Sequence, residues 1–315
     1  MRSSVTMAVI IWLIATSIRV LEVLSVNSGV DLEISRYLPV LLQDLFYVFI
    51  LVYYRFKIQS IESGNFVDLL WKVFATGLVT TVISLSIRLF YDSIADTMLA
   101  ENEYLETFLK SVNVALISVF LISTLTVWKK LILYQKSRKL VAYWNVFEIA
   151  LVASIFFNLT CLTLQEHLIF EILFAVMAIM AIILSANLKW VAYLNFKQKW
   201  KSVLIIVLIT IYIFYFFTYL YVSPEEAITN FNAIDDLFII VVFTFLLFYS
   251  IFSLLVILFN LPTSSVFEKK MEEAINFQRL SQSIQQGENE DQIFDVLLNS
   301  SMNAVYADAG WIEVN

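Results

Sequence analysis

The chain has 315 residues, of which 60% are hydrophobic, 16% are aromatic and only 15% are charged, and its formal net charge is −7. Its mean hydropathy is +0.82. An ordinary soluble domain is closer to half apolar and a quarter charged, and a disordered chain is poor in aromatic residues, so this composition excludes both classes and indicates a membrane protein.

Eight stretches are long and apolar enough to cross a bilayer, for which a helix needs about 20 mostly apolar residues. Pro39 lies at the entry to the second of them, and Pro262 is expected to follow the end of the eighth. The last two stretches contain no charge inside their apolar runs, which makes a soluble buried helix a poor alternative. The expected spans are 5–26, 37–54, 66–90, 108–128, 141–164, 168–188, 202–222 and 236–260.

The connections between these spans alternate in charge. Every second loop is basic, and the basic residues are Arg55 and Lys57, then Lys129, Lys130, Lys136, Arg138 and Lys139, then Lys189, Lys197, Lys199 and Lys201. The other loops are mainly acidic and contain Asp31, Glu33, Asp92, Asp96, Glu101, Glu103, Glu106, Glu166, Glu225, Glu226, Asp235 and Asp236. Short basic loops stay in the cytoplasm, so the pattern predicts that both termini are cytoplasmic. It also explains the basic residues by topology and headgroup contact rather than by nucleic-acid binding.

A few charged side chains fall within the outer half of the predicted spans, where each costs about 2.5–3.5 kcal/mol on insertion scales. They are Arg19, Glu22, Asp44, Arg88 and Glu171, and His167 lies at the outer lip. One hypothesis is that they line a polar cavity that binds a small ligand or titrates. The other is that they form ion pairs between helices. On the inner side, Glu148 would need a cation from the basic loops or a proton.

Chemistry-bearing residues are scarce. Cys161 is the single cysteine and His167 the single histidine. This excludes an intrachain disulfide, a CxxC zinc site, a bis-histidine haem and an HExxH metalloprotease. We therefore expect no catalytic residue, no metal site and no cofactor in this chain.

After Pro262 the composition turns polar, which predicts a helix outside the bilayer. Ser265 and Glu268 have the spacing of a capping box, so a new helix is expected to begin there. Apolar residues then recur at a spacing close to 3.5, the pattern of a short coiled-coil seam. The seam residues are Phe267, Met271, Ala274, Phe277 and Ile284. Parallel pairing of this seam predicts a homodimer.

Beyond Gly287 a second amphipathic helix is expected, and AGWIEVN at 309–315 resembles the opening of a β-strand. A lone strand needs a sheet to join, so the chain is expected to stop inside a domain. The segment FQRLSQSIQQGENEDQIFDVLLNSSMNAVYADAGWIEV resembles the beginning of a GAF domain. The run NLPTSSVFEKKMEEAINFQRLSQSIQ resembles the junction in bacterial multi-span proteins whose GAF domain precedes a SpoIIE-type serine/threonine phosphatase. None of that phosphatase's catalytic motifs is present here.

The resemblance implies a bacterial inner-membrane receptor in three parts. Residues 1–262 form an eight-span sensor bundle, 263–287 a cytoplasmic signalling helix and 288–315 the incomplete start of an α+β GAF domain. The expected fold class is thus an all-α polytopic membrane protein with that truncated start attached. A small-molecule stimulus of unknown identity would act on it. Two alternatives stay open, a secondary transporter or channel and an intramembrane enzyme; the near absence of glycine from the spans and of histidine from the inner face disfavours them.

Overall fold

The computed structural model describes residues 2–29, 37–59, 66–94, 102–135, 137–157, 168–222 and 236–285, with isolated positions at 294, 298, 302 and 309–311. For part of the last helix it describes the backbone alone. The helices are α1 Arg2–Ser28, α2 Tyr37–Gln59, α3 Phe66–Ile94, α4 Glu103–Ile132, α5 Arg138–Ile155, α7 Leu168–Ser185, the 3-10 helix η1 Lys189–Tyr193, α8 Phe196–Val222 and α9 Leu237–Gln285.

Each of the eight expected spans coincides with one of these α-helices, which confirms the all-α membrane bundle. Among the described residues, seven helices are long and apolar enough to cross a membrane. The remaining one, α5, carries Arg138, Lys139 and Glu148 within 18 residues. Residues 158–164, with which the expected fifth span ends, lie outside the described residues. The chain is a multi-pass membrane protein.

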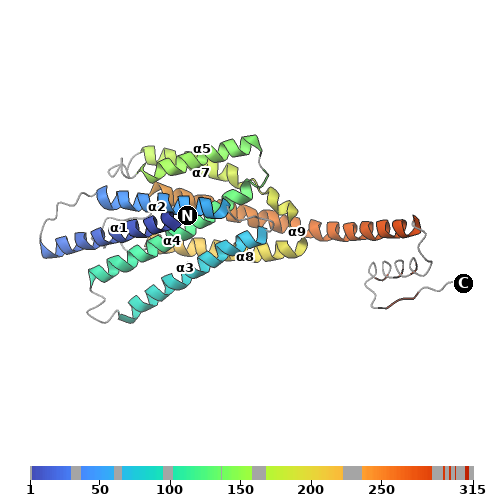
Figure 1. Cartoon of the computed structure of the whole chain (residues 1–315), viewed down its shortest axis with the longest axis horizontal. Helices are drawn as coiled ribbons and strands as arrows, with labels where there is room; N and C mark the ends of the chain where they lie inside the picture. Colours follow the sequence, from blue (N-terminus) through green and yellow to red (C-terminus); the bar gives the residue numbers. More distant parts are fainter. Residues whose placement is uncertain are drawn as a thin grey trace.

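The helices form one bundle in which α4 and α9 occupy the centre (Figure 1). Helix α4 packs against α1, α2, α3 and α9, while α9 packs against α4, α5, α7 and α8. Helix α4 has the burial expected of a central helix, because nearly every residue between Ile117 and Trp128 is buried. Buried hydroxyls on α4 bond back to the carbonyl four residues earlier, as Ser118 does to Val114 and Thr124 to Phe120. Those bonds satisfy polar groups where no water is available.

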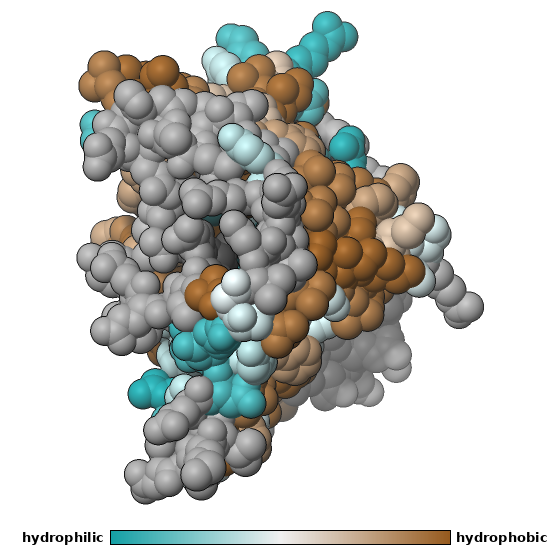
Figure 2. Space-filling view, turned by 90° about the vertical axis from the view of Figure 1, so that its left-hand side faces the viewer, coloured by the Kyte–Doolittle hydropathy of each residue, from teal (hydrophilic) through white to brown (hydrophobic). Residues whose placement is uncertain are grey.

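The outside of the bundle is apolar, as expected of a surface in contact with lipid. Large hydrophobic side chains such as Val79, Ile149, Ile179 and Leu204 are exposed on different helices. Figure 2 shows such side chains along the flank of the bundle when it is viewed from one end. We call this end, where α1 ends and α2 begins, the acidic end. The opposite end, where α2 ends and α3 begins, is the basic end.

Helix α9 corrects one expectation. The backbone is a single helix from Leu237 to Gln285, so neither a helix end before Pro262 nor a new start at Ser265 exists. The helix leaves the bundle at the basic end and extends well beyond it (Figure 1). At the exit, the Nζ atom of the buried Lys199 on α8 donates to the carbonyl oxygen of Asn260 at 3.4 Å. The local signals for a break are overridden in the folded chain.

The residues after α9 are described only in part. Phe294, Leu298 and Met302 are helical, in agreement with the expected second amphipathic helix. A Cβ atom on Gly310 would come within 3.0 Å of Met302 and 3.3 Å of Leu298, so the returning chain packs closely on this face. Of the strand expected at 309–315, the structure describes only 309–311, and these residues form no strand.

Candidate functional site: a buried polar cluster at the acidic end

Five polar side chains are buried together in the half of the bundle nearer the acidic end. We call this group the polar cluster. Its members and their exposed fractions are Arg19 at 6%, Gln43 at 4%, Asp44 at 2%, Tyr47 at 0% and Asp236 at 3%. They come from α1, α2 and the residue that precedes α9. A buried polar group is costly unless it is paired, so such a gathering inside an apolar bundle needs a physical explanation.

The cluster exists because α9 begins deep inside the bundle. Asp236 acts on Asp44 and Tyr47, which lie 7 and 10 residues after the first residue of α2, Tyr37. At 1.5 Å per residue these positions are about 10 and 15 Å from that helix end. In Figure 1, α9 accordingly starts further inside than the outer ends of α1 and α4. The amino terminus of a central helix, with its partial positive charge, therefore lies next to the acidic residues of the cluster.

Asp236 is placed there as the N-cap of α9. Its Oδ1 atom accepts a hydrogen bond from the backbone N–H of Phe238 at 3.0 Å, and its carbonyl accepts from the N–H of Ile240 at 3.1 Å. Aspartate is a preferred N-cap because its carboxylate satisfies N–H groups that the first turn leaves without partners. The ring of Phe238 packs against that of Tyr47, with centroids 5.3 Å apart. Capping and ring packing together fix Asp236 against α2.

Several atoms in the cluster lack a partner of good geometry. Arg19 donates from Nη2 to the Oε1 atom of Gln43 at 3.4 Å. Within the described residues, however, no hydrogen bond reaches Gln43 Nε2, Asp44 Oδ2 or the Tyr47 hydroxyl. That hydroxyl faces Gln43 and Ser118 as well as Asp236. Orphaned polar atoms that are buried are rare in folded proteins, and they mark places where a further ligand or a proton completes the arrangement.

The charges in the cluster divide into two groups. Arg19 interacts with Tyr47 and with Glu22, which lies one turn further along α1 and is half-buried. The charged group that faces Asp44 is the second carboxylate, Asp236. Two buried carboxylates that act on each other in a medium of low dielectric constant repel each other. The arrangement is thus suited to holding a positive charge between α2 and the start of α9.

The structure unites only part of the expected set of intramembrane charges. Arg19 and Asp44 are buried in the cluster, and Glu22 borders it. Arg88 and Glu171 are instead exposed on α3 and α7, and neither belongs to the cluster. His167 lies outside the described residues. Of the six expected residues, the polar cluster contains Arg19 and Asp44, which lie there with Gln43, Tyr47 and Asp236.

The sequence analysis did not single out these three residues as members of a site, because none of them is unusual when it is considered alone. Asp236 belongs to an acidic loop, and Gln43 and Tyr47 lie in a mainly apolar span. One signal was available: an Asp directly before a charge-free apolar run has the position of an N-cap. What the sequence does not reveal is that this cap is deep in the bundle.

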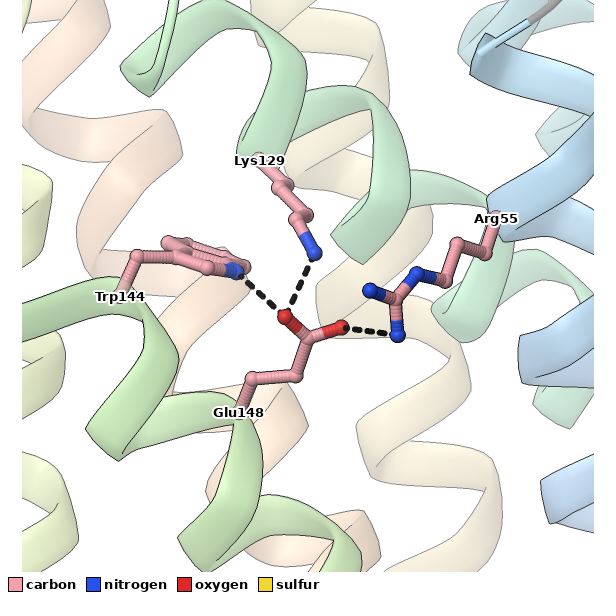
Figure 3. A network of polar contacts seen from close by, with 4 residues as sticks. All are labelled: Arg55, Lys129, Trp144 and Glu148. Atoms are coloured by element: carbon pink, nitrogen blue, oxygen red, sulfur yellow. Dashed lines mark hydrogen bonds and ion pairs between the residues drawn. The ribbon is translucent and has the colours of Figure 1, made fainter. Parts of the chain in front are cut away.

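A second polar network, at the basic end, surrounds Glu148 on α5 (Figure 3). Lys129 Nζ lies 2.6 Å from Glu148 Oε2, and Trp144 Nε1 donates to the same oxygen at 3.2 Å. Arg55 Nη1 lies 3.7 Å from Oε1. Lys129 is also 5.7 Å from the centroid of the Trp144 ring. The expectation that Glu148 needs a cation is confirmed, and the network ties α2, α4 and α5 together.

The expected coiled-coil seam lies on the part of α9 outside the bundle. Met271 and Ala274 are exposed there, as is the neighbouring Ile275. The side chains of Phe267, Phe277 and Ile284 lie outside the described residues. Apolar side chains thus project from a helix that has left the apolar bundle.

In comparisons with known proteins, no family model, no curated protein and no solved structure matches this chain. In the part of the chain that the structure describes, no three His, Cys, Asp or Glu side chains are grouped as metal ligands.

Proposed function

We propose that this chain is the membrane-embedded sensor and transmission region of a bacterial signalling receptor, with both termini in the cytoplasm. The observation that supports this most strongly is the continuity of α9. One helix runs from the buried polar cluster, through contacts with four helices of the bundle, to a stalk outside it. A stimulus that changes the packing around Asp236 would therefore displace helix α9 along its whole length.

The length of the rod makes such transmission physically reasonable. Helix α9 has 49 residues, or about 74 Å at 1.5 Å per residue. A helix is stiff along its axis, so a small shift, tilt or rotation at one end is carried to the other instead of being absorbed locally. In our proposal the stalk passes this movement to a GAF domain that begins near residue 288. An effector, of the SpoIIE-type phosphatase class, would follow.

The proposal includes a homodimer formed through the stalk. Met271 is 48% exposed and Ile275 44% exposed on the described helix, where a partner helix would remove them from water. Parallel pairing would bring both copies of the bundle to the same membrane and both effectors to the same side.

Disulfide crosslinking of the full chain tests this dimer. In a Cys161→Ser background, Met271→Cys and Ala274→Cys are each expected to crosslink between two copies in the membrane. Glu273→Cys is the matched control, because at 100° per residue position 273 is turned about 200° from position 271. No crosslink at both seam positions, or equal crosslinking at the control, would contradict the proposed stalk.

A secondary transporter is the second candidate, and one observation favours it. Transporters often place a helix terminus and buried carboxylates near the middle of the bilayer, as the start of α9 does here. Against it, the glycine within α3, Gly77, lies at a tight helix contact and not at a helix break. Ion or proton flux into proteoliposomes containing the purified chain would favour transport over signalling.

A further inference from the structure

We propose that Asp44 and Asp236 together hold one proton at neutral pH, so that the polar cluster is a proton-binding site. The site itself stands on the geometry of the cluster. Only its consequence for α9, given below, rests on the proposed receptor function.

Counting the charged and titratable groups of the cluster leads to this inference. Helix α1 contributes Arg19 and Glu22, which offset each other, and Arg19 also faces the phenol of Tyr47. Helix α2 contributes Asp44 and Tyr47, and the start of α9 contributes Asp236. From α4 comes Ser118, which is uncharged. With both aspartates ionised, two negative charges would face each other, opposed mainly by the partial positive charge of the α9 terminus. One bound proton removes most of that imbalance.

The hydrogen-bond pattern favours Asp44 as the member that carries the proton. Asp236 already accepts from the N–H of Phe238 and serves as a cap, a role that suits the ionised carboxylate. Asp44 Oδ2 accepts no bond from any described group. When it is protonated, this oxygen becomes a donor, and the carboxylate of Asp236, which acts on Asp44, is an acceptor. Protonation therefore gives Asp44 Oδ2 a hydrogen atom to donate.

A proton also fits the composition of the cluster better than a metal ion does. Hard cations such as Ca²⁺ take about six to eight oxygen ligands. Here two of the polar groups in the cluster, the Arg19 guanidinium and the Gln43 amide nitrogen, are donors and cannot serve as ligands of a cation. A proton needs no such ligand shell.

Release of the proton would act on α9 itself. It would leave two buried ionised carboxylates that act on each other, one on α2 and one at the cap of α9, and their repulsion favours separation of the two helices. Under the proposed function this displacement is the signal, and acidity on the side of the acidic end is the stimulus.

Infrared spectroscopy of the purified full chain in lipid nanodiscs tests the site. At neutral pH we expect a carbonyl stretching band from a protonated carboxylic acid, which disappears on titration to about pH 9. The band should vanish in the double variant Asp44→Asn plus Asp236→Asn. It should persist in Asp92→Asn, which removes an exposed acid on α3. Absence of the band in wild-type protein at every pH, or its persistence in the double variant, would overturn the proposal.

The same measurement separates a proton from an alkali-metal ion. Replacing sodium with choline at fixed pH should leave the band unchanged. A band that appears only after sodium is withdrawn would show that sodium occupies the site, and it would overturn the proposal. Because asparagine has the shape of protonated aspartate, the double variant is expected to fold. The wild-type titration decides the question even if it does not.

A further arm distinguishes failure of the site from failure of the proposed function. Crosslinking of Met271→Cys is compared at about pH 6 and about pH 9 in wild-type and Asp44→Asn backgrounds. A pH-dependent yield that Asp44→Asn abolishes supports the coupling of the site to the stalk. A titrating band with no pH effect on crosslinking would confirm the proton site and overturn acidity as the stimulus. If no crosslink forms at any pH, the result counts against the receptor dimer and not against the proton site.

Discussion

At the scale of single residues, Glu148 illustrates how a carboxylate is accommodated near the basic end of the bundle. It is neutralised by Lys129 at 2.6 Å and held by Trp144 at 3.2 Å, while the more distant Arg55, at 3.7 Å and 54% exposed, adds less. Exposed ion pairs contribute little to stability, whereas a partly buried charge that loses its partner is costly. The network therefore depends mainly on Lys129.

We predict that Lys129→Met lowers the free energy of unfolding by about 1–3 kcal/mol, because it leaves the Glu148 carboxylate without its closest cation. Denaturation of the purified protein in detergent, followed by tryptophan fluorescence, measures the loss. Glu148→Gln in the same chain should recover most of it, since the amide carries no charge to neutralise.

Arg55→Met is the matched control for this prediction. Its guanidinium is mostly exposed and lies further from the carboxylate, so its removal should change stability by less than about 1 kcal/mol. If the two substitutions were equally costly, or if Glu148→Gln failed to offset the loss of Lys129, the account of the network would be wrong.

At the level of single residues, the sequence predicted that Glu148 needs a partner for its charge, but it did not predict which residues lie close together in the fold. The need of Glu148 for a cation follows from its charge, but the choice of Lys129 depends on how α4 and α5 pack. Arg88 and Glu171 were grouped with Arg19 and Asp44 by depth alone, although the first two are exposed and the last two are buried. In a membrane the lipid-facing and core-facing sides of a helix are both apolar. The usual contrast that orients a helix is therefore absent.

At the scale of elements, close packing of three helices depends on Gly77. A Cβ atom at this position would lie 2.6 Å from Tyr212 Cδ2 on α8 and 2.9 Å from Phe120 Cε2 on α4. Both distances are shorter than carbon atoms tolerate, so a side chain would push rings that are themselves packed against each other. Small residues at helix contacts play this part in membrane bundles, where packing rather than exclusion of water holds helices together.

We accordingly predict that Gly77→Ala destabilises the bundle by about 1–3 kcal/mol through overpacking. Thermal unfolding in detergent measures the effect, and combining the change with Tyr212→Leu should restore part of the lost stability. Leu78→Ala, at the exposed neighbouring position, is the control and should be nearly neutral. Equal stability of Gly77→Ala and wild-type protein would mean that the helices separate at little cost.

The long helix α9 shows where local sequence rules lose to context. Pro262 has no N–H to offer the carbonyl of Leu258, and Ser265 with Glu268 has the spacing of a helix start, so both signals predict a break. The folded chain continues as one helix. Proline and a cap motif each alter a helix by a few kcal/mol at most. Lys199, which donates to the Asn260 carbonyl, helps to hold this part of the helix in place.

From the missing N–H follows a prediction for the point where α9 leaves the bundle. Pro262→Ala should restore the backbone hydrogen bond to Leu258 and stabilise the helix there by up to about 3 kcal/mol. Amide hydrogen exchange around residues 258–266 is expected to slow in this variant. Ser264→Ala, which restores no N–H group, should leave the exchange unchanged. Faster exchange in Pro262→Ala would show that proline favours the continuous helix, contrary to this expectation.

At the scale of the whole molecule, hydropathy predicted the positions of the eight α-helices that the structure describes, because a span must satisfy its backbone internally and so needs a long apolar run. The buried polar cluster could not be found in this way. It requires α9 to begin deep in the bundle, and no local pattern states the depth at which a helix starts. The distribution of charge in the loops, in contrast, predicts which end of the bundle faces the cytoplasm.

The last prediction concerns this orientation, and α5 is its critical element, since it is the one of the eight described α-helices that is not among the seven long and apolar enough to cross a membrane. In a Cys161→Ser background, single cysteines replace Glu103, Arg138, Leu168 and Lys197, which lie at the starts of α4, α5, α7 and α8. If every α-helix crosses the membrane, thiol labelling of intact cells with an impermeant reagent should reach positions 103 and 168 only. Positions 138 and 197 should react only after the cells are permeabilised, because the positive-inside rule places the basic end in the cytoplasm. Labelling of 138 and 168 from the same side would show that α5 does not span. The chain would then cross the membrane an odd number of times, and its two termini could not both lie in the cytoplasm.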